Sequence, residues 1–209
     1  LPTVKNKSNQ NCMVDKNIPH SMTCHFLCGK IFMNFTRNKN CPSCHATVNT
    51  ENSFTVRKPF VDAKSAPCSI LIKPTCGNFL QDYKPGSDLH IGISDNAGNV
   101  LSYSKLGLTE ETYGWNLALS VINNKQTNTD VGQWSLKLNQ LCQDYSSWTR
   151  ENYNSENFNC FDFVSTFLQR LKIFPFSTKL KEEVTTVYIQ PCLIQALQFS
   201  ALYNAFNSS

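Results

Sequence analysis

The sequence predicts a mixed α+β fold in which helices pack around a small antiparallel sheet. Two alternating segments, 89–94 and 100–104, flank the turn sequence DNAGN and predict a β-hairpin. Apolar residues at helical spacing predict helices over 133–145, 160–171 and 193–206. A length of 209 residues with 41% hydrophobic content allows one full-sized core and a small appendage.

The composition divides the chain into four parts. Residues 1–20 are polar and lysine-bearing, and we expect a flexible lead-in. Residues 21–50 contain closely spaced cysteines and histidines, which predict a zinc-ribbon-like module. Residues 51–67 are loosely patterned and close with SAP, which predicts a linker. Residues 68–209 then form the main α+β domain.

Other segments complete the predicted elements. Apolar or β-branched runs predict strands over 31–35, 69–73, 115–122 and 184–189, and a brief helix is expected over 78–83. The residues expected to face the core are Trp134, Leu138, Leu141 and Tyr145 in the first long helix, Phe161, Val164, Leu168 and Leu171 in the second, and Leu193, Leu197, Ala201 and Phe206 in the last.

The segment CHFLCGKIFMNFTRNKNCPSCH carries a metal-ligand pattern. His25 and Cys28 are two residues apart, as are Cys41 and Cys44. Sulfur and imidazole ligands at this spacing suit a tetrahedral zinc ion held only by protein, which makes the predicted zinc structural. Cys24 competes with His25 as the first ligand, and His45 competes with Cys44.

Cysteine distribution also bears on the compartment. Ten cysteines and two N-glycosylation patterns, Asn6-Lys7-Ser8 and Asn34-Phe35-Thr36, would fit a secreted chain with disulfides. Four cysteines fall within residues 24–44, however, and the other six are scattered. This distribution favours a reducing, intracellular compartment, cytoplasmic or nuclear.

Cys160 is the candidate nucleophile. Asn159 and Asp162 form a capping-box pattern that places Cys160 at the first position of a helix. Free N–H groups and the helix dipole at that position favour a thiolate. The alternative is a small buried apolar residue, which is what free cysteine commonly is.

His90 is the candidate base, because it is the only histidine after residue 45. Strand alternation puts Asp88 and Gly92 on its face of the strand. The hairpin would place Tyr103 or Ser104 opposite His90, and we take Ser104 as the residue that orients the ring, with Asp88 as a rival.

The two motifs resemble a known superfamily. HIGI at residues 90–93 and NCFDFV at residues 159–164 are similar to the H-x-G-I strand and N-C-x-x-F-V helix of circularly permuted papain-like proteins of the NlpC/P60 superfamily, such as lecithin:retinol acyltransferase and its relatives. The resemblance implies a permuted papain-like domain with a Cys160/His90 dyad. The chain lacks the second histidine of the acyltransferase pattern, which argues against lipid acyl transfer.

Over most of its length the chain is more closely similar to the makorin-2 opposite strand protein family. The resemblance rests on the H-x2-C and C-P-x-C segment, SILIKPTCGNFL, SDLHIGIS, GNVLSYSKLGL, GWN, Gln133-Trp134 and the NC helix. It implies a zinc-ribbon-like ligand set beside the Cys/His pair, and no activity.

These observations define two functional hypotheses. The first is a thiol hydrolase of amide or ester bonds with a structural zinc module, and the second is a non-catalytic protein-interaction module. A protein or peptide partner is expected in either case. Nucleic-acid binding through the basic ribbon residues is less favoured, since a net charge of +4 is mild. The sequence shows no apolar run of the roughly 20 residues that a membrane span needs, and it leaves the oligomeric state open.

Overall fold

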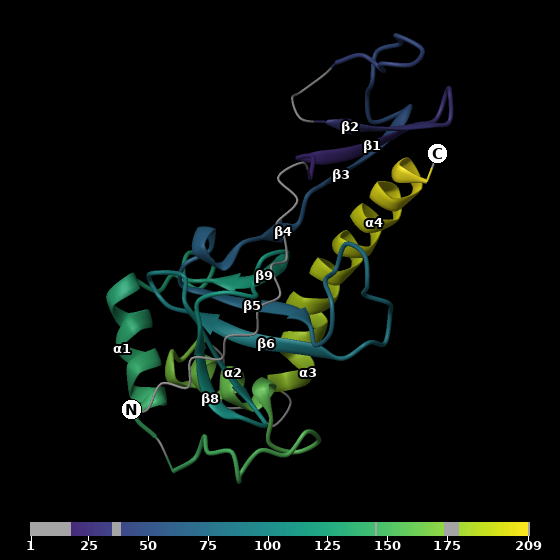
Figure 1. The fold of residues 1–209 in the computed structure, drawn as a ribbon. Coiled ribbons are helices and arrows are strands. Elements are labelled where there is room, and N and C mark those ends of the chain that lie inside the picture. Colours follow the sequence, from purple (N-terminus) through teal and green to yellow (C-terminus); the bar gives the residue numbers. More distant parts are fainter. Residues whose placement is uncertain (1–17, 35–38, 145, 174–179, 209) are drawn as a thin grey trace.

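The computed structural model describes residues 18–34, 39–144, 146–173 and 180–208. These residues form a three-stranded and a six-stranded antiparallel sheet with packed helices, which confirms the predicted α+β class (Figure 1). The lead-in up to residue 17 lies outside the described residues.

The smaller sheet forms the ribbon, by which we mean residues 18–58. Its strands are β1 (Ser21–His25), β2 (Lys30–Asn34) and β3 (Ser53–Arg57), arranged in the order β2-β1-β3. β2 confirms the predicted strand over 31–35 up to Asn34, and Phe35 is not among the described residues. β3 falls inside the segment 51–67 that was expected to be a linker. That segment therefore supplies the third strand of the ribbon.

The larger sheet has the strand order β4-β9-β5-β6-β7-β8. Its strands are β4 (Phe60–Val61), β5 (Ser69–Pro74), β6 (Leu89–Ser94), β7 (Val100–Ser104), β8 (Gly107–Glu111) and β9 (Ala118–Asn123). The predicted hairpin is confirmed in β6 and β7. Asp95 closes its turn by accepting hydrogen bonds from the N–H groups of Ala97 and Asn99, and Gly98 supplies the positive φ of 74°.

The two faces of the larger sheet differ in what covers them. Ile70, Ile72, Ile91 and Ile93 face the main core, where the helices pack. The opposite face carries a small cluster of Ala63, Leu71, Val100, Trp115 and Ala118, with the 3-10 turn η1 (Ala63–Ser65) beside it. Alternate residues of β5 and β6 therefore enter different environments.

The helices are α1 (Val131–Cys142), α2 (Cys160–Arg170), the short α3 (Leu180–Val184), the π turn η2 (Thr185–Ile189) and α4 (Gln190–Asn207). α1 buries Trp134, Leu138 and Leu141 as predicted, and Tyr145 lies outside the described residues. α2 begins at Cys160 with the predicted capping box. The Asn159 side chain accepts the N–H of Phe161, and the Asp162 carboxylate accepts the N–H of Asn159.

The brief helix expected over 78–83 is wrong, because the segment forms one hydrogen-bonded turn. The Asn78 side chain accepts the N–H groups of Leu80 and Gln81, which closes the turn locally. Ser200 and Asn204 of α4 then donate to the carbonyls of Phe79 and Leu80. The carbonyl groups of Phe79 and Leu80 accept hydrogen bonds from α4, so they are not used for the backbone hydrogen bonds that would continue a local helix.

The strand expected over 184–189 is also wrong. The residues continue from α3 through the π turn, in which the N–H of Gln190 donates to the carbonyl of Thr185. Pro191 has no N–H for a regular helical bond to Val187, and the wider turn accommodates its ring. The β-branched composition predicted a strand, but the tertiary packing of Val184 and Ile189 determined a helix.

The inward face of α4 differs from the predicted one. Its buried residues are Ala196, Phe199, Ser200 and Tyr203. Leu193 and Phe206 pack only partly against the core, and Ala201 is exposed. The hydroxyl of Ser200 enters the core because it has a hydrogen-bond partner there, the carbonyl of Phe79 at 2.9 Å.

α4 connects the ribbon with the main core. It contacts all three strands of the ribbon and also β9 (Figure 1). Met22 of β1 and Val56 of β3 are buried in the same cluster as Phe199. The ribbon is therefore packed on the main domain through one of its faces.

Candidate functional site

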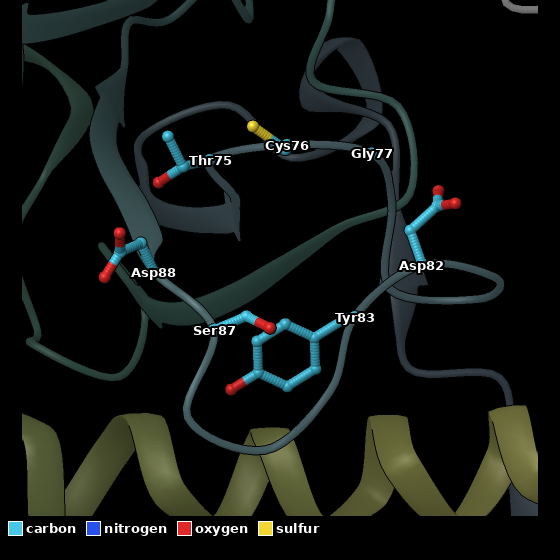
Figure 2. A pocket seen from close by; sticks show the side chains of 7 residues that line it. All are labelled: Thr75, Cys76, Gly77, Asp82, Tyr83, Ser87 and Asp88. Atoms are coloured by element: carbon cyan, nitrogen blue, oxygen red, sulfur yellow. The ribbon is translucent and has the colours of Figure 1, made fainter.

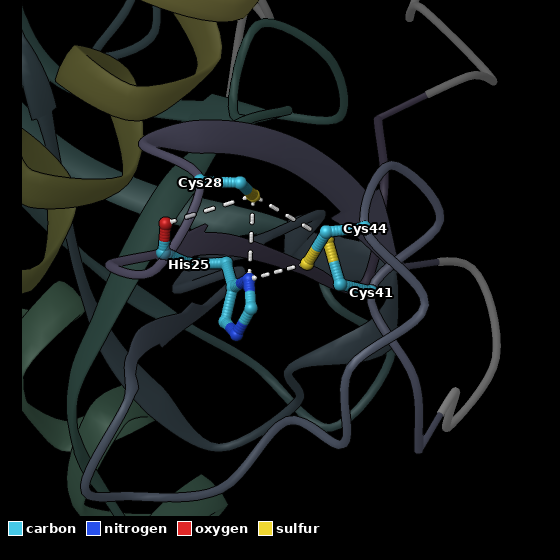
Figure 3. Close-up of side chains that lie close together, drawn as sticks. All are labelled: His25, Cys28, Cys41 and Cys44. Atoms are coloured by element: carbon cyan, nitrogen blue, oxygen red, sulfur yellow. Dashed lines mark hydrogen bonds between the residues drawn. The ribbon is translucent and has the colours of Figure 1, made fainter.

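Four predicted metal ligands meet at one end of the ribbon (Figure 3). Nδ1 of His25 lies 3.3 Å from Sγ of Cys28 and 3.3 Å from Sγ of Cys44. The sulfurs of Cys28 and Cys41 are 3.7 Å apart. All four ligand atoms lie within 4.8 Å of one another, so these residues could bind a metal ion.

The spacing fits a zinc ion. Sulfurs placed 2.3 Å from zinc in a tetrahedron are about 3.8 Å apart, close to the Cys28–Cys41 separation, whereas a disulfide needs about 2.05 Å. The described cysteines, including Cys28, Cys41 and Cys44, are free thiols. A disulfide in place of the metal would require the sulfurs to move together.

Strand alternation selects His25 over Cys24. Cys24 lies opposite Ile31 and Phe54 on the ribbon face shared with Met22, whereas His25 points to the other face. His25 is fully buried, and its Nε2 has no hydrogen-bond partner in the described structure. His45 takes a positive φ of 60° and stays outside the cluster.

The two thiols of the second knuckle differ in pKa. The backbone N–H of Ala46 lowers the pKa of Cys44, but burial and the neighbouring Cys41 and Cys28 together raise it above its usual value, whereas the pKa of Cys41 is lowered. The backbone N–H of Cys44 lowers the pKa of the Cys41 thiol, burial raises it, and the N–H of Ser43 lowers it further. Metal ligation requires thiolate, so N–H groups turned toward the sulfur support a metal site.

Cys160 lies at the N-terminus of α2, packed against β6. Its side chain is only 5% exposed and belongs to the main core with Ile91. Burial raises the pKa of the thiol, although backbone N–H groups of Ile91, Phe161 and Cys160 itself lower it. Desolvation outweighs the helix N-terminus here, so the neutral thiol is the favoured form.

His90 has a different set of neighbours. It pairs with Lys73 across β5 and β6, and its ring lies 5.7 Å from that of Trp115. Burial and then the Lys73 charge lower the pKa of His90 to about 4, with Glu111 opposing. The imidazole is therefore neutral near pH 7.

β6 separates the two candidate catalytic residues. Ile91 faces the core that holds Cys160, whereas His90 shares the face of Gly92, over which Trp115 lies. A Cβ added at Gly92 would come 3.1 Å from the Trp115 indole. Among the described residues no hydrogen bond joins Cys160 and His90, and the two side chains lie on different sides of β6.

The residues considered for orienting His90 have other partners. The hydroxyl of Ser104 accepts the N–H of Leu106 at 3.2 Å, and the hydroxyl of Tyr103 donates to the carbonyl of Thr149 at 2.8 Å. The register of β6 and β7, continued from Gly92–Ser102, would place Ser104 beside His90. No hydrogen bond from Ser104 or Asp88 to the ring is found in the described part of the chain.

A polar network beside His90 was not anticipated from the sequence. Glu111 accepts hydrogen bonds from Ser102 Oγ at 2.8 Å and Trp115 Nε1 at 3.0 Å, and it forms an ion pair with Lys73 at 3.4 Å. Burial alone would raise the pKa of Glu111, but Lys73, Ser102 and Trp115 lower it below its usual value. Lys73 also lies 4.4 Å from the Trp115 ring centre. The network fixes Trp115 over the sheet.

A surface cavity of about 370 Å³ lies at the loop that follows β5 and precedes β6 (Figure 2). The loop connecting these strands lines it with Thr75, Cys76, Gly77, Asp82, Tyr83, Ser87 and Asp88. Neither Cys160 nor His90 lines this cavity, so it offers no substrate site at the candidate dyad.

No helix among the described residues combines the length and the apolar character that a membrane span requires.

Two comparisons with known proteins gave matches. The chain is 28% identical over 187 residues to a human protein, "MKRN2 opposite strand protein", and the match covers 85% of this chain and 82% of the human one. No solved structure matches. The similarity expected from the sequence is confirmed for this relative, whereas similarity to NlpC/P60 proteins is not shown. The DUF4796 C-terminal family matches residues 53–206, more than half of the chain, and the chain therefore belongs to that family.

Proposed function

We propose that this protein is a zinc-containing, non-catalytic protein-interaction module whose contact surface is the first knuckle of the ribbon. One observation carries the proposal. The turn between His25 and Cys28 presents Phe26 and Leu27 to solvent with exposed fractions of 57% and 70%. Metal ligands flank this apolar pair, so bound zinc would fix its backbone before a partner arrives.

The metal in this proposal is structural. His25, Cys28, Cys41 and Cys44 fill a tetrahedral coordination sphere and leave no position for water or substrate. Zinc bound there supplies folding free energy to a sheet that has little core of its own. Its contribution to function is the shape of the knuckle.

The net charge of the ribbon indicates the class of partner. Lys30, Lys39, Arg57 and Lys58 outnumber the acidic Glu51 among the described ribbon residues. Lys30 lies opposite His25, next to the apolar pair, whereas Arg57 and Lys58 lie at the other end of β3. Apolar anchors on a ribbon of positive charge fit an acidic protein segment that contributes aliphatic or aromatic side chains. Single-stranded nucleic acid fits less well, because bases stack on aromatic rings and Leu27 has none.

Cysteine chemistry supports an intracellular site of action, cytoplasmic or nuclear. The nine described cysteines are all unbridged, and the candidate ligands need free thiols. A reducing compartment maintains that state.

A second candidate function is the permuted papain-like thiol hydrolase. It is favoured by the three backbone N–H groups near Cys160 Sγ, which could stabilise a thiolate or an oxyanion. In such a reaction Cys160 attacks an amide or ester carbonyl, the amine or alcohol leaves, and water hydrolyses the thioester, with His90 transferring protons and Ser104 orienting it. The buried thiol and the Trp115 contact of His90 make this the weaker candidate.

The zinc proposal predicts one bound zinc per chain after extensive dialysis. Cys41→Ser should lose that zinc, because it removes a buried thiolate ligand, whereas Cys24→Ser should retain it, because Cys24 lies on the opposite ribbon face. Elemental analysis of the purified variants measures both. Well-folded, metal-free wild-type protein with Cys28 in a disulfide would refute the metal centre.

The knuckle proposal predicts that a random peptide library displayed on phage yields acidic sequences with apolar anchors. Their affinity should fall about tenfold or more in Phe26→Ser and Leu27→Ser, since each change removes a side chain worth about 1.5–3 kcal/mol on burial. Leu106→Ser is the matched control, because Leu106 is similarly exposed in the β7–β8 turn. Fluorescence polarisation with labelled peptides measures the affinities.

Equal losses in Leu106→Ser, or no enriched peptides at all, would contradict this assignment of the knuckle. Labelled oligouridylate that binds wild type and loses affinity in Phe26→Ser would instead identify a nucleic-acid module.

The non-catalytic proposal predicts that Cys160 reacts with iodoacetamide at least about tenfold more slowly than the exposed Cys76 near neutral pH. His90→Ala should leave the Cys160 rate unchanged, because Cys160 lies on the core side of β6 and the His90 side chain lies on the other side. Competition between light and heavy iodoacetamide, read at each site by mass spectrometry, measures both rates. Fast alkylation of Cys160 that disappears in His90→Ala would favour the hydrolase.

A further inference from the structure

An apolar stripe with no partner among the described residues begins in η2 and continues along the outward face of α4. Val187 and Ile194 are exposed by 55% and 56%. The stripe, all of it exposed, consists of Val187, Pro191, Ile194, Gln198, Ala201 and Ala205.

The spacing of the stripe is that of a coiled-coil seam. Successive members are four, three, four, three and four residues apart, which is the alternation of heptad a and d positions. α4 has 18 residues and is therefore about 27 Å long. Most of that length is available for one long contact with another helix.

We propose that this stripe binds a second copy of the chain, with the two α4 helices antiparallel. In that arrangement each a position faces a d position of the second copy. Val187 meets Ala205, Pro191 meets Ala201, and Ile194 meets Gln198. Each larger residue of the first half of the stripe then packs against a small residue or the flexible Gln198 side chain, so the seam is complementary to itself.

Charge supports the same occupant and orientation. No residue from 185 to 208 is charged, so two copies of the helix meet without like-charge repulsion. Exposed Glu182 and Glu183 lie just before this segment, and the basic ribbon packs on α4 toward its other end. Antiparallel pairing brings the acidic end of each copy to the basic ribbon end of the other, whereas parallel pairing would bring like charges together.

Sedimentation velocity of the full, zinc-loaded chain tests the proposal. We expect a dimer at about 10–100 µM, and we expect monomer for Ile194→Glu and for Ala201→Lys. Leu136→Glu should remain dimeric, because Leu136 is equally exposed on α1, away from the stripe. Circular dichroism melting of each variant shows that the monomers are folded. A monomeric wild type, or dimers that persist in both stripe variants, would overturn the proposal.

Photo-cross-linking tests the orientation separately. With p-benzoylphenylalanine at Ala205, the antiparallel seam predicts covalent dimers joined to the peptide that contains Val187 of the second copy. Residues 187 and 205 are too far apart within one helix for this product to be intramolecular. Cross-links to the Ala205 region of the second copy would overturn the antiparallel arrangement. Neither test involves the knuckle, so the dimer and the proposed function can fail independently.

Discussion

The packing of the ribbon on α4 is the interaction on which the rest of the account depends. A three-stranded sheet of five-residue strands cannot bury enough apolar surface to fold alone. One face of the ribbon obtains a core from α4, through Met22 and Val56. The other face carries His25 and the candidate metal centre. In the proposed zinc-bound form, the metal and the helix stabilise opposite faces of one small sheet and together hold the exposed knuckle at its end.

The alternation of β6 controls the chemistry available to Cys160. Because Ile91 points into the core, His90 points away from Cys160, and a one-residue change of register would exchange these faces. Gly92 leaves room for Trp115 on the His90 side, and Glu111 and Lys73 fix that indole. Burial then favours the neutral form of both the thiol and the imidazole. A neutral thiol on α2 and a neutral imidazole on the far side of β6 form no ion pair.

Local signals explain what could be predicted from the sequence. The hairpin of β6 and β7, the capping box of α2 and the two pairs of candidate metal ligands each depend on residues close in sequence. The failures involve distant contacts. Residues 184–189 resemble a strand in composition, but the burial of Val184 and Ile189 in the core favours a helix. Which face of α4 is buried depends on Ser200, whose hydroxyl donates a hydrogen bond to the carbonyl of Phe79, 121 residues away. Lys73 and Glu111 form an ion pair although they are 38 residues apart in sequence, and no spacing pattern predicts such a pair.

Hydrogen–deuterium exchange with and without zinc tests the link between the metal and α4 most directly. If the metal fixes the ribbon and the ribbon packs on α4, zinc removal should speed amide exchange in β1, β2 and β3 and in the last turns of α4. Protection of β5, β6 and α2 should remain, because their core does not include the metal centre. If zinc removal leaves amide exchange in the ribbon unchanged, the account is contradicted. It is also contradicted if exchange speeds up in the ribbon but not in the last turns of α4.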